Sequence, residues 1–147
     1  MVLLHGDQLC IDDTEYMKFR EQVRDPDWQR EFLAKSLDER HAFASQARQQ
    51  SQSAIADKSS QIMDVNQNEV LQLLKSTQQT TVIHGHTHRP AIHQIQLDSP
   101  IAEHSEARRI VLGDWDQQGW FAELNPDGVR LPPFPPQTPC APQYPAP

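Results

Sequence analysis

The hydrophobic pattern of this chain alternates between short apolar runs and longer polar stretches with helical spacing. Strands are expected where residues are mostly apolar or alternate with polar ones, at residues 2–4, 80–83, 95–97, 108–112, 120–124 and 129–131. The run 2–4 stops at His5-Gly6-Asp7 and predicts a buried strand that leads into a functional loop. Asn125-Pro126-Asp127-Gly128 predicts a hairpin turn between the last two strands.

Four segments carry residues that are typical of helix N-termini. These starts are expected at Asp12 or Asp13, at Asp25-Pro26, at the capping box Ser36-Leu37-Asp38-Glu39 and at Asn66-Gln67-Asn68-Glu69. Residues 26–53 have a thin apolar face, so composition alone favours a surface helical hairpin over a lid that covers a substrate. The order of strand, helices, strand and then several strands predicts an α/β layered domain with a mixed sheet.

Composition narrows the class of protein. The 147 residues suit one domain, and a mean hydropathy of −0.70 indicates a soluble chain. The formal net charge of −7 argues against a general nucleic-acid binder, although metals or local cations would still permit an anionic substrate. No apolar stretch approaches the roughly 20 residues that span a bilayer, and no signal peptide is recognisable, so a cytoplasmic protein is expected.

Cysteine and proline usage add two expectations. Cys10 and Cys140 lie far apart and have neither metal-ligand nor redox spacing, so two free thiols in a reducing compartment are expected. Residues 132–147 hold eight of the 12 prolines. This tail is expected to be disordered and to form neither sheet nor helix, with a proline-rich docking ligand as the alternative.

The segment His84-Gly85-His86-Thr87-His88-Arg89-Pro90 carries the candidate chemistry. Neutral imidazole is a common metal ligand, and residues at i and i+2 of an extended backbone point the same way, so the three histidines are able to share one side. A second histidine, His5, also follows an apolar run and precedes glycine, with Asp7 just beyond. Functional sites of α/β folds lie at such strand ends.

Three uses of these histidines compete. A histidine-triad nucleotidyl-transfer site fits poorly, because Gly85 and Thr87 stand where apolar residues would alternate with histidine. A structural zinc site would close four ligands, whereas His5, His86 and His88 leave an open, catalytic position. A dinuclear hydrolase is the third use, and it needs oxygen ligands in addition.

The motif "GHTHRP" with an upstream "HGD" resembles the calcineurin-like metallophosphoesterases. In this order, "LLHGDQLCIDD", "IMDVNQN", "VIHGHTHRP" and "RIVLGDW" resemble the branch that cleaves UDP-2,3-diacylglucosamine in lipid A synthesis, over about residues 2–131. The resemblance implies the C-terminal part of a four-layer α/β/β/α sandwich, with residues 14–60 as a helical lid insertion. Cyclic-nucleotide or protein phosphoesterases are a weaker alternative, because "MDVN" and the lid residues do not match them.

The resemblance also implies an activity. It predicts hydrolysis of the pyrophosphate bond to 2,3-diacylglucosamine 1-phosphate (lipid X) and UMP, at a centre of two Mn²⁺ ions. The enzyme would lie at the cytoplasmic face of the inner membrane, with Trp28, Phe32 and Leu33 of the lid facing acyl chains.

Individual roles follow residue by residue from the matched motifs. His5 would bind one metal, and His86 and His88 would supply ligands to the pair, whereas His84 lies outside Gly-His-x-His and would orient a ligand. The residues implied to contact the substrate are Asp13, Arg48, Ser51, Lys58 and His86. Ile55 stands where the family usually has asparagine, which removes one polar contact.

The sequence departs from the family at its front. The Asp-x-His and Gly-Asn-x-Asp motifs do not occur, so the chain resembles the C-terminal portion of a longer enzyme, truncated or given a downstream start. Without the bridging aspartate, three histidines would hold one Zn²⁺ or Mn²⁺ weakly, and little activity is expected from these residues alone. The alternative is a non-catalytic metal-binding or interaction fragment that pairs with the N-terminal segment.

Overall fold

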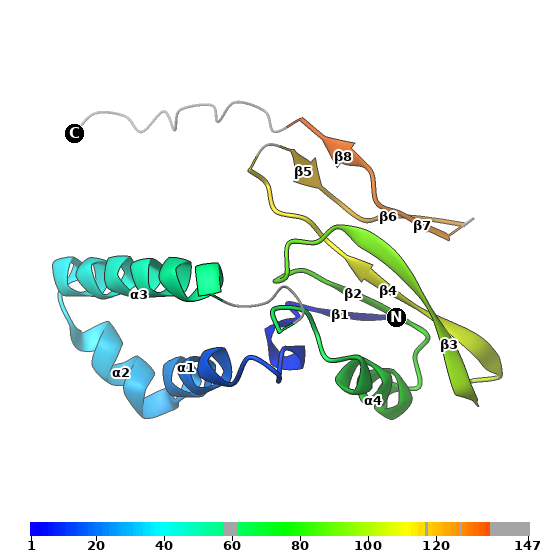
Figure 1. Cartoon of the computed structure of the whole chain (residues 1–147), viewed down its shortest axis with the longest axis horizontal. Coiled ribbons are helices and arrows are strands. Elements are labelled where there is room, and N and C mark those ends of the chain that lie inside the picture. Colours follow the sequence, from blue (N-terminus) through cyan, green and yellow to red (C-terminus); the bar gives the residue numbers. More distant parts are fainter. Residues whose placement is uncertain (58–61, 117, 127, 136–147) are drawn as a thin grey trace. The chain divides into compact units, whose positions relative to one another are not determined.

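A computed structural model describes residues 1–57, 62–116, 118–126 and 128–135 (Figure 1). The chain divides into two compact units. Unit 1 comprises Met1–Asp7 and Gln67–Pro147, and unit 2 comprises Gln8–Asn66. The predicted lid segment 14–60 therefore falls inside unit 2, and its role as a lid stays a prediction.

Unit 1 is built on a four-stranded mixed sheet. Its strands are β1 (Val2–Leu4), β2 (Thr81–His84), β3 (Ala91–Ile101) and β4 (His104–Val111), in the order β1-β2-β4-β3. The β1–β2 and β2–β4 pairs are parallel, and β3 runs antiparallel to β4. The mixed α/β class expected from the order of elements is confirmed.

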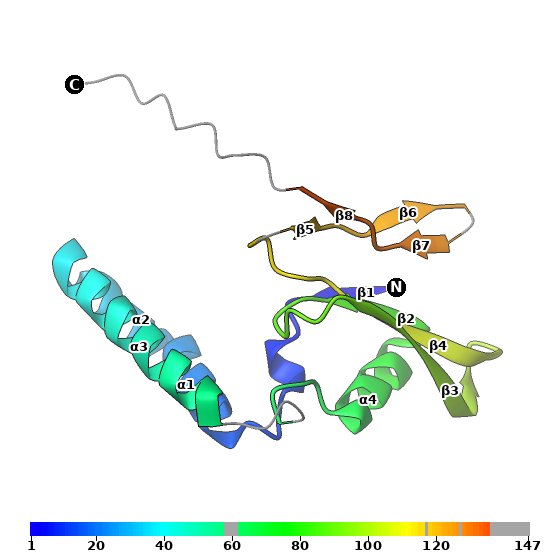
Figure 2. The ribbon, with the colours of Figure 1, turned by 45° about the horizontal axis from the view of Figure 1, so that its top comes forward.

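The core of unit 1 lies between this sheet and helix α4 (Gln67–Thr77), which runs along one face of the sheet in both ribbon views (Figures 1 and 2). Val70 and Leu74 are four residues apart, so they share one side of the helix, and both are fully buried. Val82 and Ile110 of the central strands are fully buried as well. The predicted start of this helix near Asn66 is confirmed.

Strand β1 forms as expected, but the prediction that it is buried is wrong. Leu3 is 67% exposed, and the flanking Val2 and Leu4 are only partly buried. Among the described residues β1 pairs only with β2, which makes it an edge strand. An edge strand has neighbours on one side alone, and this is the physical reason that its apolar residues stay accessible.

The C-terminal part of unit 1 contains two short ladders. Strand β5 (Gly119–Trp120) pairs with β8 (Pro133–Phe134), and β6 (Glu123–Asn125) pairs with β7 (Gly128–Arg130). The second pair is the predicted hairpin. The expectation of no sheet beyond Leu131 is wrong at β8, where the Phe134 ring packs over Gly119 and lies 5.1 Å from the Trp115 ring. Residues 136–147 lie outside the described residues.

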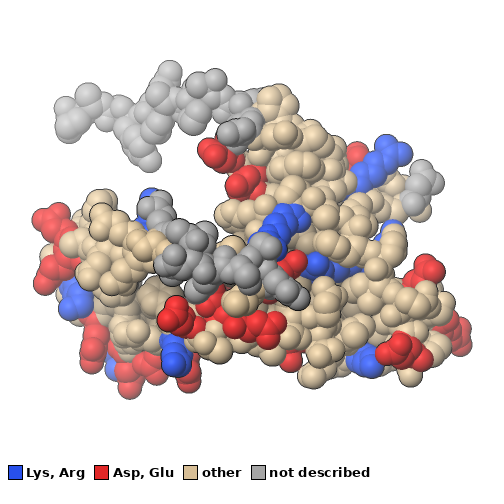
Figure 3. Space-filling view, viewed as in Figure 1, with Lys and Arg blue, Asp and Glu red and all other residues tan. Residues whose placement is uncertain are grey.

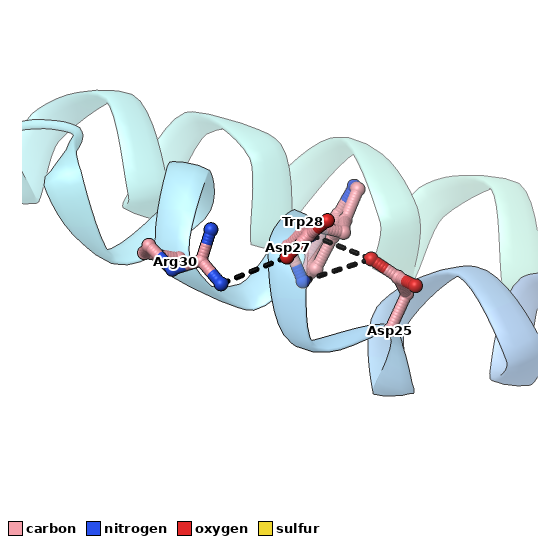
Figure 4. A network of polar contacts seen from close by, with 4 residues as sticks. All are labelled: Asp25, Asp27, Trp28 and Arg30. Atoms are coloured by element: carbon pink, nitrogen blue, oxygen red, sulfur yellow. Dashed lines mark hydrogen bonds and ion pairs between the residues drawn. The ribbon is translucent and has the colours of Figure 1, made fainter.

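Among its described residues, unit 2 contains three α-helices whose starts match the sequence signals. They are α1 (Thr14–Arg24), α2 (Pro26–Ala34) and α3 (Leu37–Asp57). Asp13, and not Asp12, caps α1 by accepting a hydrogen bond from the Tyr16 N–H. Asp25 caps α2 by accepting from the Asp27 and Trp28 N–H groups, beside an Asp27–Arg30 ion pair (Figure 4).

Helices α2 and α3 are joined by an aromatic cluster of Trp28, Phe32 and Phe43. Trp28 and Phe32 stack with ring centroids 4.9 Å apart, and Phe43 lies 5.6 and 5.3 Å from the two rings. Leu33, in contrast, is 64% exposed. Two of the three residues expected to face acyl chains therefore pack against each other and against Phe43.

The "MDVN" motif ties the two ends of unit 2 together. The Asn66 N–H donates to the Leu9 carbonyl at 2.8 Å, and the Asn66 side-chain amide donates to both carboxylate oxygens of Asp12 at 3.0 and 3.2 Å. Leu9, Cys10 and Val65 are buried next to these bonds in the sequence. The motif thus has a structural role, because it closes the base of the inserted unit.

The capping box of α3 makes a pH-dependent contribution that we expect to be measurable. The Ser36 hydroxyl and N–H donate to the Glu39 carboxylate, and these bonds lower the pKa of Glu39. A lowered pKa in the folded state stabilises the helix end above the ordinary pKa of glutamate, and the effect is lost as pH falls through the folded value. The protection factor of the Ser36 amide, which compares its exchange rate with the intrinsic rate at the same pH, should therefore fall on acidification, and Glu39→Gln should abolish that fall.

The surface in Figure 3 carries many acidic side chains, which gather along α1 and α2. These two helices carry the exposed acidic residues Glu15, Glu21, Asp27 and Glu31, and they also carry the basic residues Lys18, Arg20, Arg24 and Arg30. Within the described part of the chain, no helix has both the length and the apolar character needed to cross a membrane.

Candidate metal centre

Three parallel strands bring the candidate residues to one edge of the sheet. Leu4 of β1 pairs with His84 of β2, which pairs with Val111 of β4, so these strands end in register. Backbone bonds continue past the strands: the Gly85 N–H donates to the His5 carbonyl at 3.0 Å, and the Leu112 N–H donates to the His84 carbonyl at 2.7 Å. The two histidine motifs, 80 residues apart, therefore meet.

His5 is positioned by a buried carboxylate. Its Nδ1 lies 3.1 Å from Oδ1 of Asp7, whose side chain is only 4% exposed, whereas the imidazole is 61% exposed. Because a carboxylate oxygen only accepts, the bond places the proton on Nδ1 and leaves Nε2 as the available ligand atom. The His5 and His86 rings are 4.9 Å apart, edge to face.

His88 has a similar but longer contact. Its Nδ1 lies 3.7 Å from Oδ2 of Asp114, in the loop that follows β4, and both side chains are more than half exposed. Two of the three predicted ligands thus have a carboxylate at Nδ1. This arrangement is how protein carboxylates orient metal-binding imidazoles.

The three histidines of the loop do not share one side by strand alternation. His86 and His88 have φ values of 65° and 53°, in the left-handed region, so the extended backbone assumed for the alternation does not exist after His84. The prediction that His84, His86 and His88 share one side of an extended backbone is wrong for that reason.

His84 is turned into the protein. It is 1% exposed, its Nδ1 lies 2.9 Å from the Gly85 carbonyl oxygen, and its Nε2 lies 3.4 Å from Nη1 of the buried Arg109. Both ring nitrogens are thus engaged by protein groups.

The donor chemistry of the site fits a divalent transition metal in part. Imidazole nitrogen suits Mn²⁺ and Zn²⁺. The buried Thr87 hydroxyl has no hydrogen-bond partner among the described residues, so this oxygen is available to a further group inside the loop. Among those residues, however, no group of three or more His, Cys, Asp or Glu side chains is gathered closely enough to hold an ion. The structure thus brings His5 and His86 together but does not assemble a complete ligand set.

The predicted substrate contacts lie in unit 2 except for His86. Asp13 is the N-cap of α1, and Arg48 and Ser51 are exposed on α3, three residues apart and so on one side of the helix. Ile55 lies on the same helix, and Lys58 lies outside the described residues.

Sequence reasoning did not single out Arg109. The residue lies in a run that predicts a strand, and a charged residue there is ordinarily expected to face solvent. Its 2% exposure shows that it belongs to the interior. The only signal in the sequence was its place in the "RIVLGDW" motif.

We expect Asp7→Asn to weaken Mn²⁺ binding by about tenfold. The amide oxygen of asparagine still accepts from His5 Nδ1, but it lacks the negative charge that makes the imidazole a better donor, and such partners contribute about 10–100-fold to metal affinity. Isothermal titration of the purified chain with Mn²⁺ measures the effect. Asp98→Asn, at an exposed position of β3, is the matched control and should leave the affinity unchanged. Equal affinities for Asp7→Asn and the parent chain would contradict a role for Asp7.

The sequence of this chain is similar to those of several known proteins. The chain is 48% identical over 130 residues to a UDP-2,3-diacylglucosamine hydrolase of Cellvibrio japonicus, which covers 88% of this chain and 52% of that protein. Relatives with the same name from Pectobacterium carotovorum and Bordetella pertussis are 45% and 44% identical, over 92% and 88% of this chain. The chain spans about half the length of these curated relatives. No family model matches the chain.

Proposed function

Since this chain is related to the UDP-2,3-diacylglucosamine hydrolases over about nine-tenths of its length, we propose that it contributes to the Mn²⁺-dependent hydrolysis of UDP-2,3-diacylglucosamine. The pyrophosphate bond is cleaved to give 2,3-diacylglucosamine 1-phosphate (lipid X) and UMP, a step of lipid A synthesis. The observation that carries the proposal is the meeting of the His5 and His86 rings at adjoining strand ends.

The residues of unit 1 would hold and orient the metal. Bound Mn²⁺ supplies positive charge for the phosphoryl oxygens and lowers the pKa of water, which makes a nucleophile available at neutral pH. His5, His86 and His88 would bind through ring nitrogen. Asp7 and Asp114 lie at the Nδ1 atoms of His5 and His88, which would leave the Nε2 atom of each ring for coordination.

The substrate contacts would come mainly from unit 2. Arg48 would offer its planar fork to phosphate oxygens, Lys58 would add a point charge, and the Ser51 hydroxyl would hydrogen-bond near the nucleotide. Asp13 would contact the polar part of the substrate in addition to capping α1. Ile55 would leave one polar atom of the substrate without a protein partner.

The proposal extends to architecture and location. The mixed sheet would form part of a four-layer metallophosphoesterase sandwich, and helices α1–α3 would act as the lid. Leu33 and Leu37, which are 64% and 74% exposed, are among the lid residues with apolar surface available to acyl chains. Because its proposed substrate is a lipid, the protein would act at the cytoplasmic face of the inner membrane.

A chimera tests the function directly. The 130 matched residues of the Cellvibrio japonicus relative are replaced by those of this chain, and UMP release from UDP-2,3-diacylglucosamine is followed with Mn²⁺. We expect turnover that disappears on addition of a chelator. UDP-N-acetylglucosamine, which lacks the acyl chains, should not be hydrolysed, and a folded chimera that binds Mn²⁺ yet releases no UMP would overturn the proposal.

A second candidate function is supported by the incomplete ligand set. Within the described residues no three ligand-type side chains gather, which suits a protein that binds a metal weakly without catalysis. The purified 147-residue chain discriminates the two. We expect Mn²⁺ binding with UMP release near the uncatalysed background, and robust turnover by this chain would show that its own residues complete the centre.

A further inference from the structure

Three side chains are buried and polar or charged among the residues that the structure describes: Asp7, His84 and Arg109. All three belong to unit 1 and adjoin the candidate metal centre. Asp7 is explained by its contact with His5. Arg109 contacts His84, and burying a guanidinium group costs several kcal/mol unless such contacts offset the cost.

The topology brings Arg109 to His84. Arg109 of β4 pairs with Val82 of β2, and His84 lies two residues further along the same strand, on the same face of the sheet. Nη1 of Arg109 reaches to 3.4 Å from Nε2 of His84. A guanidinium nitrogen only donates, so Nε2 of His84 must accept and carries no proton.

The other nitrogen of His84 is fixed by the same logic. Its Nδ1 lies 2.9 Å from the Gly85 carbonyl oxygen, which only accepts, so Nδ1 carries the proton. These two contacts favour the His84 tautomer that carries its proton on Nδ1, with the ring held between a guanidinium group and a backbone carbonyl. The ring also packs over Gly6, since a Cβ at Gly6 would stand 2.8 Å from Nδ1.

The Gly85 peptide connects this pair to the ligand histidines. The Gly85 carbonyl accepts a second bond from the Thr87 N–H at 2.8 Å, and the Gly85 N–H donates to the His5 carbonyl at 3.0 Å. Both polar groups of Gly85 are thus fixed, immediately before His86 enters the left-handed region. The direction of the His86 side chain depends on this peptide.

We propose that Arg109 is a positioning residue for the metal centre: it fixes the tautomer of His84, whose Nδ1–H orients the Gly85 carbonyl and so aims His86. The consequence for metal binding rests on the proposed function. The tautomer itself follows from the hydrogen bonds alone.

Nitrogen-15 NMR of the metal-free, full-length chain tests the first link. We expect the His84 Nδ1 resonance to be that of a protonated ring nitrogen and the Nε2 resonance to be that of an unprotonated one. Arg109→Met should remove this preference, and Arg109→Lys, which keeps a buried donor, should restore it in part. A wild-type His84 protonated at Nε2 would overturn the proposal whether or not the chain binds Mn²⁺.

Two substitutions at His84 separate positioning from packing. In His84→Asn the amide nitrogen replaces Nδ1 and still donates to Gly85, whereas in His84→Gln the longer side chain replaces Nε2 and loses that donor. If His84 positions the Gly85 peptide, the Mn²⁺ affinity of His84→Asn should be within about threefold of that of the parent chain. The affinity of His84→Gln should be about tenfold weaker. If His84 only fills space in the core, the order of the two affinities should be reversed, because glutamine fills the volume of the imidazole better than asparagine does.

Controls keep the two proposals distinguishable. His104→Asn, at an exposed position of β4, should leave both the His84 spectrum and the Mn²⁺ affinity unchanged. If His84 has the expected tautomer and no Mn²⁺ binds to any variant, the proposed function fails, while the link from Arg109 to Gly85 stands. If Gln at position 84 binds Mn²⁺ more tightly than Asn, the positioning role is wrong.

Discussion

Replacing Gly6 by alanine is expected to lower the free energy of unfolding by about 2–4 kcal/mol, the sum of backbone strain and a steric overlap. Gly6 has φ of +106°, which residues with a Cβ rarely adopt. A Cβ there would also stand 2.8 Å from Nδ1 and 3.2 Å from Cβ of His84, whose side chain is buried. The midpoint of urea denaturation of the purified chain measures the loss.

Gly85→Ala is the matched control for this experiment. Gly85 lies in the adjoining loop, has no positive φ, and its nearest neighbour to an added Cβ would be the His5 carbonyl oxygen at an ordinary 3.8 Å. We expect a change within about 1 kcal/mol at this position. If the two alanine variants are equally stable, Gly6 does not have the conformation described here.

Replacing His86 by asparagine is expected to weaken Mn²⁺ binding by roughly a hundredfold or more, because even the outer partners of metal ligands contribute about 10–100-fold. Asparagine is chosen because His86 has φ of 65°, which asparagine tolerates better than other residues with a side chain. The effect on the metal is thereby separated from an effect on the backbone. Titration calorimetry with Mn²⁺ measures the affinity.

His104→Asn serves as the control, since it makes the same chemical change at an exposed residue outside the two histidine loops. Far-ultraviolet circular dichroism of both variants should match that of the parent chain. An unchanged Mn²⁺ affinity in a folded His86→Asn variant would show that His86 is not a ligand, and the proposed centre would then have to be sought elsewhere.

The helix starts were the most predictable part of the fold. Asp13, Asp25 and the Ser36–Glu39 box each cap a helix where the sequence indicated, because a capping bond joins atoms within three residues of each other. The predicted hairpin formed between β6 and β7, where Asn125 pairs with Gly128, two residues that are also close in the sequence. Local bonds of this kind depend little on the rest of the chain.

Predictions failed where distant residues decide the outcome. The exposure of Leu3 depends on how many strands flank β1, and the short strand at Pro133–Phe134 depends on Gly119 accepting an aromatic ring. The aromatic cluster of Trp28, Phe32 and Phe43 was not predicted at all, and it depends on how α2 packs on α3. No spacing within a single element reports on these contacts.

The sequence by itself determined which residues carry the candidate chemistry. The motifs around His5 and His86 indicate metal chemistry, and the relatives support the same relationship. Only the tertiary structure decided how the histidines differ. Parallel register brings His5 to His86, positive φ at His86 breaks the alternation, and Arg109 holds His84 inside the protein. Imidazole chemistry is a property of the residue, whereas its direction and partners depend on strands that meet across 80 residues of chain.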